Sequence, residues 1–486
     1  MNPRLLVGLL LAVLAAHMLH YGICTQDDAF ISFRYAANLI GGDGLVYNPG
    51  EPVEGYTNFL WTMLLAGAMA VGINPVMASV LGGLLAALAL ALAGWLLAAA
   101  LIDRPWVGLL VPAFIAMDAG LALEGMQGLE TLLYAALLAW ALLLTHHELQ
   151  DPDAPPRSAV LLALAALTRP EGAVVFAGIG LARLLLARKL ERRLLIGLGI
   201  FAVVVGGHFA FRLAYYGAPL PNTFYAKVGT ESAQVTRGLV YLAAFAAEHI
   251  VLCSLALIGG LLAAIRWKQQ SATIRILLGF TVCDLLYVAA VGGDFKETFR
   301  FIIPVMVPLA LLAGLAVRRV PGRWIPAVVL LLALGVDARQ SIPRASRAAA
   351  FRADDMERRL AVGAWLHSNV PPTTILAVHS AGTIPYAAGL YTIDMWGLSD
   401  PHIARKTIEG MGQGTAGHEK TDYVYTFGRS PDLYLPEEDL LTAEPVRLPV
   451  PADFPADFEE RYKQLSIQIE GGWFNFFRRR GTLSDR

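Results

Sequence analysis

Long runs of apolar residues recur along residues 1–338, and they constrain the fold more than any other feature of the chain. The runs cover 5–24, 57–73, 76–101, 106–118, 129–145, 158–168, 171–187, 193–214, 237–265, 273–292, 301–317 and 323–337. They are apolar on every helical face, which predicts helices surrounded by lipid or by other apolar helices. Many of them approach the ~20 residues that a helix needs to cross a bilayer. We therefore expect a polytopic α-helical membrane protein.

Charged residues are scarce in these runs and common after them. The chain of 486 residues is 56% hydrophobic and 16% charged, whereas a soluble domain carries roughly a quarter charged residues. The net charge of −1 argues against a nucleic-acid partner, which would show as a basic patch. Cys24, Cys253 and Cys283 have no CxxC spacing, so they predict neither a disulfide framework nor a zinc site.

The connections between the runs set the expected orientation. Those at 187–193, 265–275 and 317–323 are basic, which predicts that they lie in the cytoplasm. The alternate connections, the opening loop 24–56 and the tail then fall on the outer face. We expect the membrane itself as a partner, with membrane lipid around the helices.

The first run and the runs between residues 57 and 118 set the expected number of crossings. Residues 5–24 lack a small-residue cleavage site, so we expect them to remain as the first transmembrane helix. The opening loop and residues 124–130 are both expected on the outer face. Only two of the three runs between residues 57 and 118 can therefore cross the membrane. Either 57–73 or 106–118 should therefore be re-entrant or interfacial, and about 11 transmembrane helices are expected in total.

The tail, 339–486, has the pattern of a small α/β domain. Residues 352–370 have helical periodicity, 373–379 resemble a buried strand, and 390–400 resemble a second strand that ends in acidic residues. Alternating helix and strand predict one extracytoplasmic domain beside a transmembrane module at 1–338.

Ionisable residues gather in the loops of the expected outer face. Polar groups near the hydrocarbon boundary are costly unless they are paired or solvated, so such clusters suggest function. A transporter would place these groups near the midplane, whereas a one-sided arrangement favours a reaction chamber. The loops contain Asp27, Asp28, Arg34, Glu51, Glu54, Glu124, Glu130, Arg169, Glu171, Lys227, Asp294, Lys296, Glu297 and Arg300.

The opening loop 24–56 begins with two adjacent carboxylates, Asp27 and Asp28. The run from Thr25 predicts an interfacial helix that two glycines end, with Thr25 as its N-cap and with Asp27 and Arg34 on one face. Both aspartates would lie in the first turn, where the helix dipole favours negative charge. Capping alone would explain them, but the other outer charges favour chemistry.

A carboxylate at that depth suits general-base catalysis. It would accept the proton of a hydroxyl group that attacks an activated centre. A sugar on a lipid phosphate is such a centre, and Arg or Lys side chains would stabilise the departing phosphate. Arg169, Lys227 and Arg300 are the candidates, with contact to lipid headgroups as the simpler explanation for each.

Two further groups of residues are candidates for binding substrate. Glu54, Tyr56 and Asn58 precede an apolar run and are expected to hold sugar hydroxyls, while nearby Trp61 fits an aromatic belt better. The tail contains His379, Asp394, Asp400 and His402. For these residues we expect a structural role in the first place and the lining of an acceptor site in the second. The tail residues lack the helical spacing of a zinc motif. The sequence contains no P-loop, no GxGxxG after a strand and no GxSxG, so ATP hydrolysis and redox chemistry have no support.

Four stretches of the sequence resemble a known family. They are DDAFISFRYAANLIGGDGLVYNPGEPVEGYTNFLW (27–61), GLETLLYAALLAWAL (128–142), ALTRPEGAVVFA (166–177) and IDMWGLSDPHIAR (393–405). Together they resemble the GT-C superfamily of membrane glycosyltransferases, and more narrowly the actinobacterial arabinofuranosyltransferases and their bacterial relatives. The resemblance spans the chain.

The resemblance implies a polyprenyl-phosphate-linked sugar donor, a groove for its lipid, inverting transfer and a bacterial plasma membrane. It implies that the aspartate pair supplies the base, and we expect Asp28 to do so with Asp27 assisting. Some members hold a divalent cation such as Mg²⁺, Mn²⁺ or Ca²⁺, for which Asp27, Glu124 and Glu130 would provide oxygen ligands. The tail is shorter than in the actinobacterial enzymes, so the acceptor remains open between a glycan, a lipid and a protein.

The sequence therefore predicts a membrane enzyme that transfers a sugar, arabinofuranose first, to an acceptor hydroxyl outside the membrane. Within the same superfamily, a mannosyl- or aminoarabinosyltransferase is the alternative. A lipid-linked-sugar flippase would need polar groups through the bilayer, and His208 and Asp284 are the main polar residues in the apolar runs. A scaffold for other wall enzymes is the third alternative, in which the aspartate pair would be dispensable.

Overall fold

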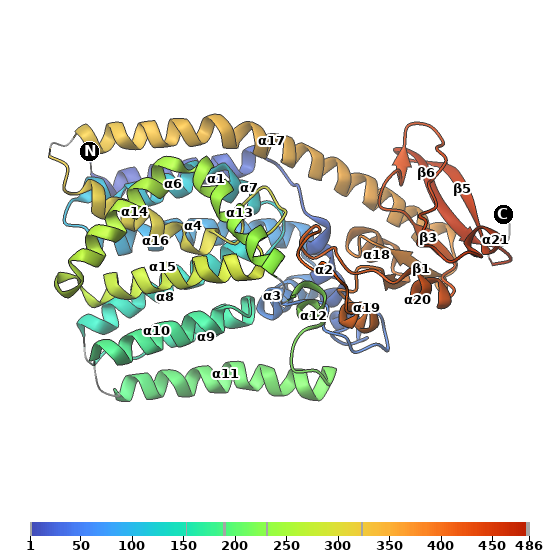
Figure 1. The fold of residues 1–486 in the computed structure, drawn as a ribbon, viewed down its shortest axis with the longest axis horizontal. Helices are drawn as coiled ribbons and strands as arrows, with labels where there is room; N and C mark the ends of the chain where they lie inside the picture. The colour runs from blue at the N-terminus through green and yellow to red at the C-terminus, as the bar shows by residue number, and fades with distance from the viewer. Residues whose placement is uncertain (1, 152, 188–190, 230–231, 322–323, 483–486) are drawn as a thin grey trace.

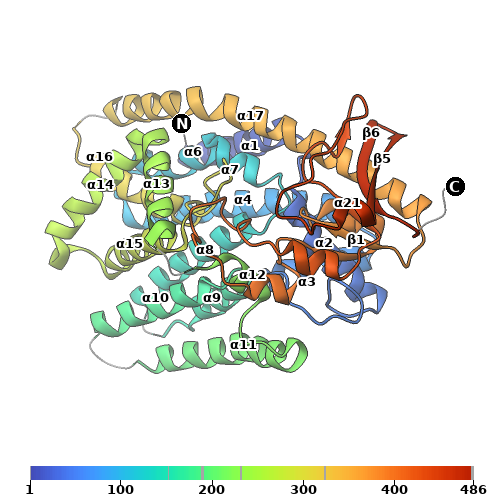
Figure 2. The same cartoon turned by 45° about the vertical axis from the view of Figure 1, so that its right-hand side comes forward.

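The computed structural model describes residues 2–151, 153–187, 191–229, 232–321 and 324–482, with the side chains of 324–334, 336–337 and 340 left out. The expected connections 187–193 and 317–323 and the apolar run 323–337 each contain residues outside this set. A bundle of helices forms the body, and a sheet domain lies at one end of it (Figures 1 and 2).

Most of the predicted apolar runs are helices. Among the described residues, five helices are long and apolar enough to cross a membrane, or up to six with one bent pair. The five are α1 (Pro3–His20), α4 (Pro75–Leu101), α8 (Thr131–Gln150), α11 (Arg192–Tyr216) and α15 (Ala272–Val291). The predicted multi-pass helical architecture is therefore confirmed.

The remaining runs form shorter apolar helices. The runs 57–73 and 106–118, one of which was expected to be re-entrant or interfacial, are both of this kind. The shorter helices are α3 (Phe59–Ala70), α5 (Pro105–Gly108) with α6 (Leu110–Met117), α9 (Arg157–Thr168), α10 (Gly172–Ala187), and η2 (Ile303–Val305) with α16 (Met306–Val317).

The run 237–265 is not the single helix that its hydropathy predicts. It divides into α13 (Ser232–Glu248) and α14 (Ile250–Ile265), which meet at an angle of 103°. Polar residues occupy the corner, where buried Glu248 forms an ion pair with Arg344 of a neighbouring helix. The bend lies where polar side chains form contacts with a neighbouring helix, and mean hydropathy does not detect such contacts.

The opening loop forms α2 (Asp27–Gly41), which ends at Gly42 with φ of 93°, as predicted. Its start differs from the prediction, because the N-cap residue is Gln26, whose side chain makes no capping hydrogen bond. Thr25 Oγ1 is buried and has no hydrogen-bond partner in the described part of the chain. Residues 29–36 are all buried, so protein covers α2 where an interfacial helix was expected.

The body and the sheet domain share one long helix, α17 (Trp324–Asn369). It runs along the bundle and continues beside the sheet, as Figure 1 shows. The expected boundary at residue 338 lies inside this helix. The sequence indicated an apolar run and a later separate helix, where the structure has one continuous element.

The C-terminal domain contains a mixed six-stranded sheet. Its strand order is β2-β1-β3-β6-β4, with β5 paired to β6. Strands β1 (Ile375–Val378), β2 (Tyr391–Asp394) and β3 (Leu433–Leu435) are parallel, and β4 (Leu441–Thr442), β5 (Tyr462–Ile469) and β6 (Gly472–Arg479) add antiparallel pairs. The two predicted strands are β1 and β2. Buried Val362 and Leu366 of α17 pack on one face of the sheet together with Ile384.

Candidate active site

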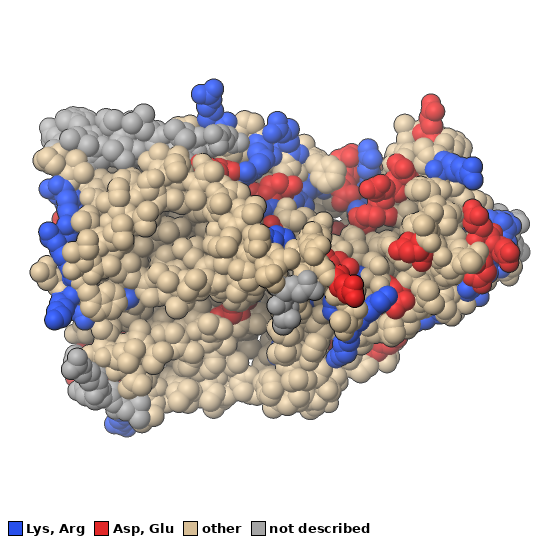
Figure 3. All heavy atoms as spheres, viewed as in Figure 1, with Lys and Arg blue, Asp and Glu red and all other residues tan. Residues whose placement is uncertain are grey.

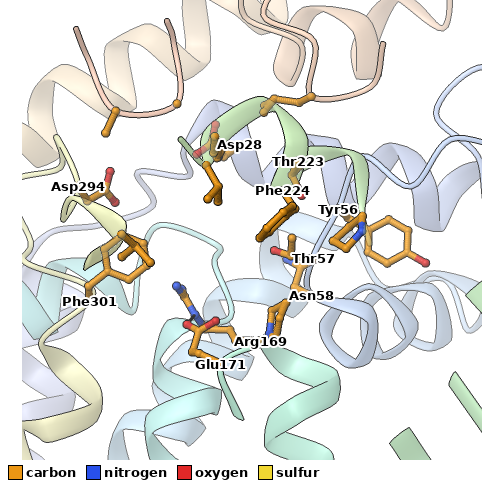
Figure 4. A pocket seen from close by; sticks show the side chains of 18 of the residues that line it. Asp28, Tyr56, Thr57, Asn58, Arg169, Glu171, Thr223, Phe224, Asp294 and Phe301 are labelled. Carbon is orange, nitrogen blue, oxygen red and sulfur yellow. Dashed lines mark hydrogen bonds and ion pairs between the residues drawn. The ribbon is translucent and has the colours of Figure 1, made fainter. Parts of the chain in front are cut away.

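A cavity of about 300 Å³ lies where the helical body meets the C-terminal domain. Its wall comes from α2, the residues before α3, the α9–α10 connection, α12 (Asn222–Lys227), the loop 293–301 and residues 416–418. Figure 4 shows Asp28, Arg169 and Asp294 around this space, each on a different element. The loops that the sequence assigned to one face of the membrane thus meet at one site.

Asp28 faces the cavity as one half of an ion pair. Its Oδ2 accepts a hydrogen bond of 2.7 Å from Lys296 Nζ, and its side chain is 32% exposed. Burial raises the pKa of Asp28, but the charges of Lys296, Lys227 and Arg300 outweigh it and hold this pKa well below its ordinary value. Asp28 is therefore an ionised and accessible carboxylate, as a general base must be.

Asp27 has a different environment from its neighbour. Its Oδ1 accepts from the amide of Thr383 at 2.7 Å and its Oδ2 accepts from the amide of Gly382 at 2.9 Å. These amides begin α18 (Thr383–Ala388) of the C-terminal domain. A Cβ added at Gly382 would lie 1.8 Å from the carbonyl oxygen of Asp27, so the two backbones touch. Asp27 therefore joins α2 to the C-terminal domain and does not line the cavity.

Arg169 lies in a network along one wall of the cavity. It forms ion pairs with Glu130 at 3.2 Å and with Glu171 at 2.5 Å. Asn58 Nδ2 donates to Glu130 at 2.9 Å and to the Ser32 hydroxyl at 3.1 Å. These carboxylates already compensate the guanidinium charge of Arg169.

Two more predicted cations line the cavity, and they differ in their partners. Arg300 forms an ion pair with Asp294. The side chain of Lys227, at the end of α12, makes no direct hydrogen bond or ion pair within the described part of the chain. Its charge acts on Asp28 and Asp294 without direct contact, so its ammonium group is the most available one for an anionic ligand.

The residues before α3 divide between the cavity and the interior. Tyr56 lines the cavity, and its hydroxyl lies 3.1 Å from that of Tyr216. Glu54 points away and binds the guanidinium of Arg212 at 2.5 and 3.0 Å. Trp61 is only 4% exposed and donates to the carbonyl of Gly128 at 3.1 Å, so its place in an aromatic belt is ruled out by packing.

Two residues from the predicted set lie in the interior. The Arg34 guanidinium donates to the carbonyls of Tyr47, Pro385 and Leu390 at 2.7, 2.8 and 2.7 Å, which ties the opening loop to the C-terminal domain. It makes no pair with Asp27, although the two share a helix. Glu124 accepts from the hydroxyls of Thr131 and Thr298 at 2.6 and 2.7 Å.

The predicted tail residues stay within the C-terminal domain, outside the cavity wall. Asp400 caps α19 (Pro401–Arg405) by accepting from the amide of His402 at 2.9 Å. The His402 ring stacks on Tyr425 at 3.9 Å. His379 Nε2 lies 3.4 Å from the Tyr423 hydroxyl. Their contacts fit the structural role that the sequence analysis placed first.

The structure also brings in residues to which the sequence gave no role. Lys296 pairs with Asp28, and Arg212, Arg237 and His418 line the cavity. Lys296 was visible as one outer charge among several, and Arg212 as a charge near the end of an apolar run. His418 carried no signal, because the loop around it has no regular pattern.

The geometry does not fit the expected divalent cation. Within the described residues, no group of three or more His, Cys, Asp or Glu side chains could hold a metal ion. Asp27, Glu124 and Glu130 have separate partners, namely backbone amides, threonine hydroxyls and Arg169. We derive no step through a metal ion.

Comparison with known sequences gives two kinds of match. Residues 347–477 match a family described as Domain of unknown function (DUF8728). A terminal β-(1→2)-arabinofuranosyltransferase of Mycobacterium tuberculosis is 29% identical over 64% of this chain and 56% of its own length. Its counterpart from Corynebacterium glutamicum is 26% identical over 63% of this chain and 50% of its own length. The chain thus spans about half the length of the curated relatives it matches.

Solved structures share the fold at low identity. ArnT of Cupriavidus metallidurans bound to undecaprenyl phosphate matches with a TM-score of 0.57 and 14% identity, over 80% of this chain and 85% of that one. An Archaeoglobus fulgidus oligosaccharyltransferase tethered to an acceptor peptide matches with a TM-score of 0.55 and 12% identity, over 80% of this chain and 64% of that one. The chain therefore shares the fold of these two structures, and its sequence is similar to the terminal arabinofuranosyltransferases, as the resemblance predicted.

Proposed function

We propose that this chain is an inverting membrane glycosyltransferase that moves a sugar, arabinofuranose first, from polyprenyl phosphate to an acceptor hydroxyl. One observation carries the proposal: Asp28, whose pKa nearby cations hold low, and Lys227, which makes no direct ion pair with a described residue, line the same cavity. A base and an anion-binding cation on one chamber suit transfer from a lipid phosphate. The relatives named as arabinofuranosyltransferases support the choice of sugar.

In the proposed reaction, the acceptor oxygen attacks C1 of the donor sugar and gives its proton to Asp28. The bond between C1 and the phosphate oxygen breaks, and the phosphate leaves on the lipid. Lys227 stabilises the charge of the departing phosphate, with Arg169 and Arg300 behind it. Tyr56 and Asn58 orient the sugar, since both line the same cavity.

A second hollow supports a lipid donor. An apolar groove of about 380 Å³ runs between α10 and α15, and it shares Glu171 and Tyr287 with the charged cavity. Val174, Ile179 and Phe280 are among the residues that line it. An isoprenoid chain in this groove would hold its phosphate near Lys227. ArnT, which shares the fold, was solved bound to undecaprenyl phosphate, and this supports a lipid-phosphate donor.

The proposed enzyme sits in a bacterial plasma membrane, with about 11 crossings formed by the long and the shorter helices. The body 1–338 would span the membrane, and 339–486 would form the extracytoplasmic domain that holds the acceptor, a glycan, lipid or protein. Lys and Arg gather at the end of the body away from the sheet domain (Figure 3), where the α14–α15 and α16–α17 connections lie (Figure 1). Such a basic end supports a cytoplasmic location for it.

Sugar transfer by the purified protein in detergent tests the proposal. Polyprenyl-phospho-arabinofuranose and a synthetic glycan acceptor would be supplied to the wild type, Asp28→Asn and Asp27→Asn. We expect transfer by the wild type, a loss of at least about a hundredfold in Asp28→Asn, and a smaller loss in Asp27→Asn. Transfer that survives in Asp28→Asn would remove Asp28 as the base. Absence of transfer from arabinose, mannose and aminoarabinose donors would overturn the enzyme class.

A further inference from the structure

A glycine-rich segment of the C-terminal domain reaches over the cavity. It follows α19 and contains Gly410, Gly412 and Gly417, whose φ values are 76°, 97° and 79°. These left-handed conformations are ones that glycine adopts without strain. A Cβ at Gly412 would lie 2.6 Å from the backbone nitrogen of Gln234 in α13, so the segment lies directly on the helical body.

Polar contacts of Glu419 and Lys420 hold the end of this segment in place. Glu419 accepts from the amides of Gly412 and Gly414 at 2.7 and 2.9 Å and forms an ion pair with Arg237 at 3.3 Å. Arg237 Nη1 also donates to the carbonyl of Gly414 at 3.0 Å. Lys420 donates to the carbonyls of Tyr225 and Ala404 at 2.9 and 2.8 Å. His418, which directly precedes these two residues, therefore has a defined place in the cavity wall.

His418 stands between the two charged parts of the cavity. Its ring lies 5.0 Å from that of Phe295, the neighbour of Lys296, and 4.0 Å from that of Trp396. On the other side, a Cβ at Gly417 would lie 3.1 Å from Lys227 Cε. The imidazole makes no hydrogen bond with any described residue, although it lines the cavity.

The imidazole suits a neutral hydroxyl better than an anion. Burial lowers the pKa of His418, and the charges of Lys227 and Lys296 lower it further against the opposing charge of Asp28. A neutral ring offers one donor and one acceptor nitrogen, which matches the two roles of a hydroxyl group. Phe295 beside it is 48% exposed and provides an apolar face for a sugar ring.

We propose that His418 is an acceptor-positioning residue, which binds a hydroxyl of the acceptor glycan and places it between Asp28 and the donor. The inference rests on the proposed function. The lipid groove meets the cavity at Glu171 and Tyr287 of the helical body, whereas His418 belongs to the C-terminal domain, so the donor and His418 would reach the cavity from different elements. The Glu419–Arg237 pair holds the segment that carries the ring.

The test compares His418→Ala and His418→Gln with the wild type in detergent, with His367→Ala as the matched control. His367 is an exposed histidine of α17, away from the cavity. We expect His418→Ala to raise the KM for a synthetic oligoarabinofuranoside acceptor by about tenfold, the worth of one hydrogen bond. The KM for the donor should change by less than about twofold, and His418→Gln should recover part of the loss because its amide both donates and accepts.

Calorimetric binding of the same glycan without donor separates this inference from the proposed function. If the wild type transfers no sugar but binds the glycan, and His418→Ala weakens that binding, the proposed function fails and the acceptor role of His418 stands. An unchanged acceptor KM, or a wild type that does not bind the glycan, overturns the inference. Equal losses for donor and acceptor with a lower unfolding temperature would also overturn it, because they indicate a structural role.

Discussion

Asp28 and Lys296 are far apart in the chain and form an ion pair, in which Asp28 faces the cavity and Lys296 is buried. Lys296→Met keeps the length of the side chain and removes its charge. Burial alone raises the pKa of Asp28, and Lys296 is the largest of the charges that lower it. The variant therefore raises the pKa of Asp28, so the base becomes protonated at a higher pH. We expect the acidic limb of the kcat/KM profile to move upward by about one pH unit or more.

The control for this experiment is Lys268→Met, an exposed lysine in the connection between α14 and α15. Its pH profile should match that of the wild type. If the acidic limb stays in place in Lys296→Met while activity persists, another group accepts the acceptor proton.

Sequence reasoning found Asp27 and Asp28 together but had no means to separate their roles. The distinction depends on partners far along the chain: Lys296 for Asp28, and the amides of Gly382 and Thr383 for Asp27. Residue type and helical spacing report neighbours within one element, not contacts across the fold. For the same reason, the prediction that Asp27 and Arg34 share one helix face did not establish a contact, and the two side chains do not pair in the structure.

At the scale of elements, Asp27 holds α2 against α18 through two backbone amides. Asp27→Ala leaves both donors without their partner, which costs about 1–3 kcal/mol of unfolding free energy. We expect a lower thermal unfolding temperature in detergent, with a smaller loss of transfer than in Asp28→Asn. Asp43→Ala, at an exposed position just after α2, is the control and should be neutral. An unchanged unfolding temperature in Asp27→Ala would show that this connection contributes nothing.

Close packing of α14 against α16 depends on one small residue. A Cβ at Gly259 would lie 1.8 Å from the carbonyl oxygen of Leu312. Gly259→Val must push the two helices apart, since small residues are what allow membrane helices to approach closely. We expect a marked fall in the unfolding temperature, measured by thermal unfolding in detergent micelles. Gly206→Val, on α11 where nothing lies within 4 Å, should have little effect; equal effects of the two changes would contradict this packing argument.

Elements that local sequence patterns determine could be predicted, whereas elements that depend on contacts between distant residues could not. Apolar runs and glycine stops are local, so the helical body and the end of α2 at Gly42 were predicted. The 103° bend at His249, the continuity of α17 and the β5–β6 hairpin depend on tertiary packing and were missed. The strands β1 and β2 were found because their buried residues form short apolar runs.

At the scale of the whole molecule, two hollows of different chemistry meet at Glu171 and Tyr287. One is charged and lies beneath the C-terminal domain, and the other is apolar and lies between α10 and α15. A lipid phosphate has the same division between a polar head and an apolar chain. The arrangement therefore accounts for why the ion pairs of the cavity lie beneath the C-terminal domain while mostly apolar residues line the groove.

A substitution that blocks the groove tests whether the lipid chain of such a donor binds there. Gly178 of α10 lines the groove, and nothing lies within 4 Å of a Cβ added there, so Gly178→Trp places an indole in the space without disturbing the helix. We expect the KM for a long-chain polyprenyl donor to rise by about tenfold or more through lost apolar contact. A short-chain donor analogue, which does not reach the indole, should keep its KM. Gly199→Trp, on the exposed side of α11, is the matched control. Equal KM changes for long and short donors would place the lipid outside this groove, because only a chain that occupies it can sense the indole.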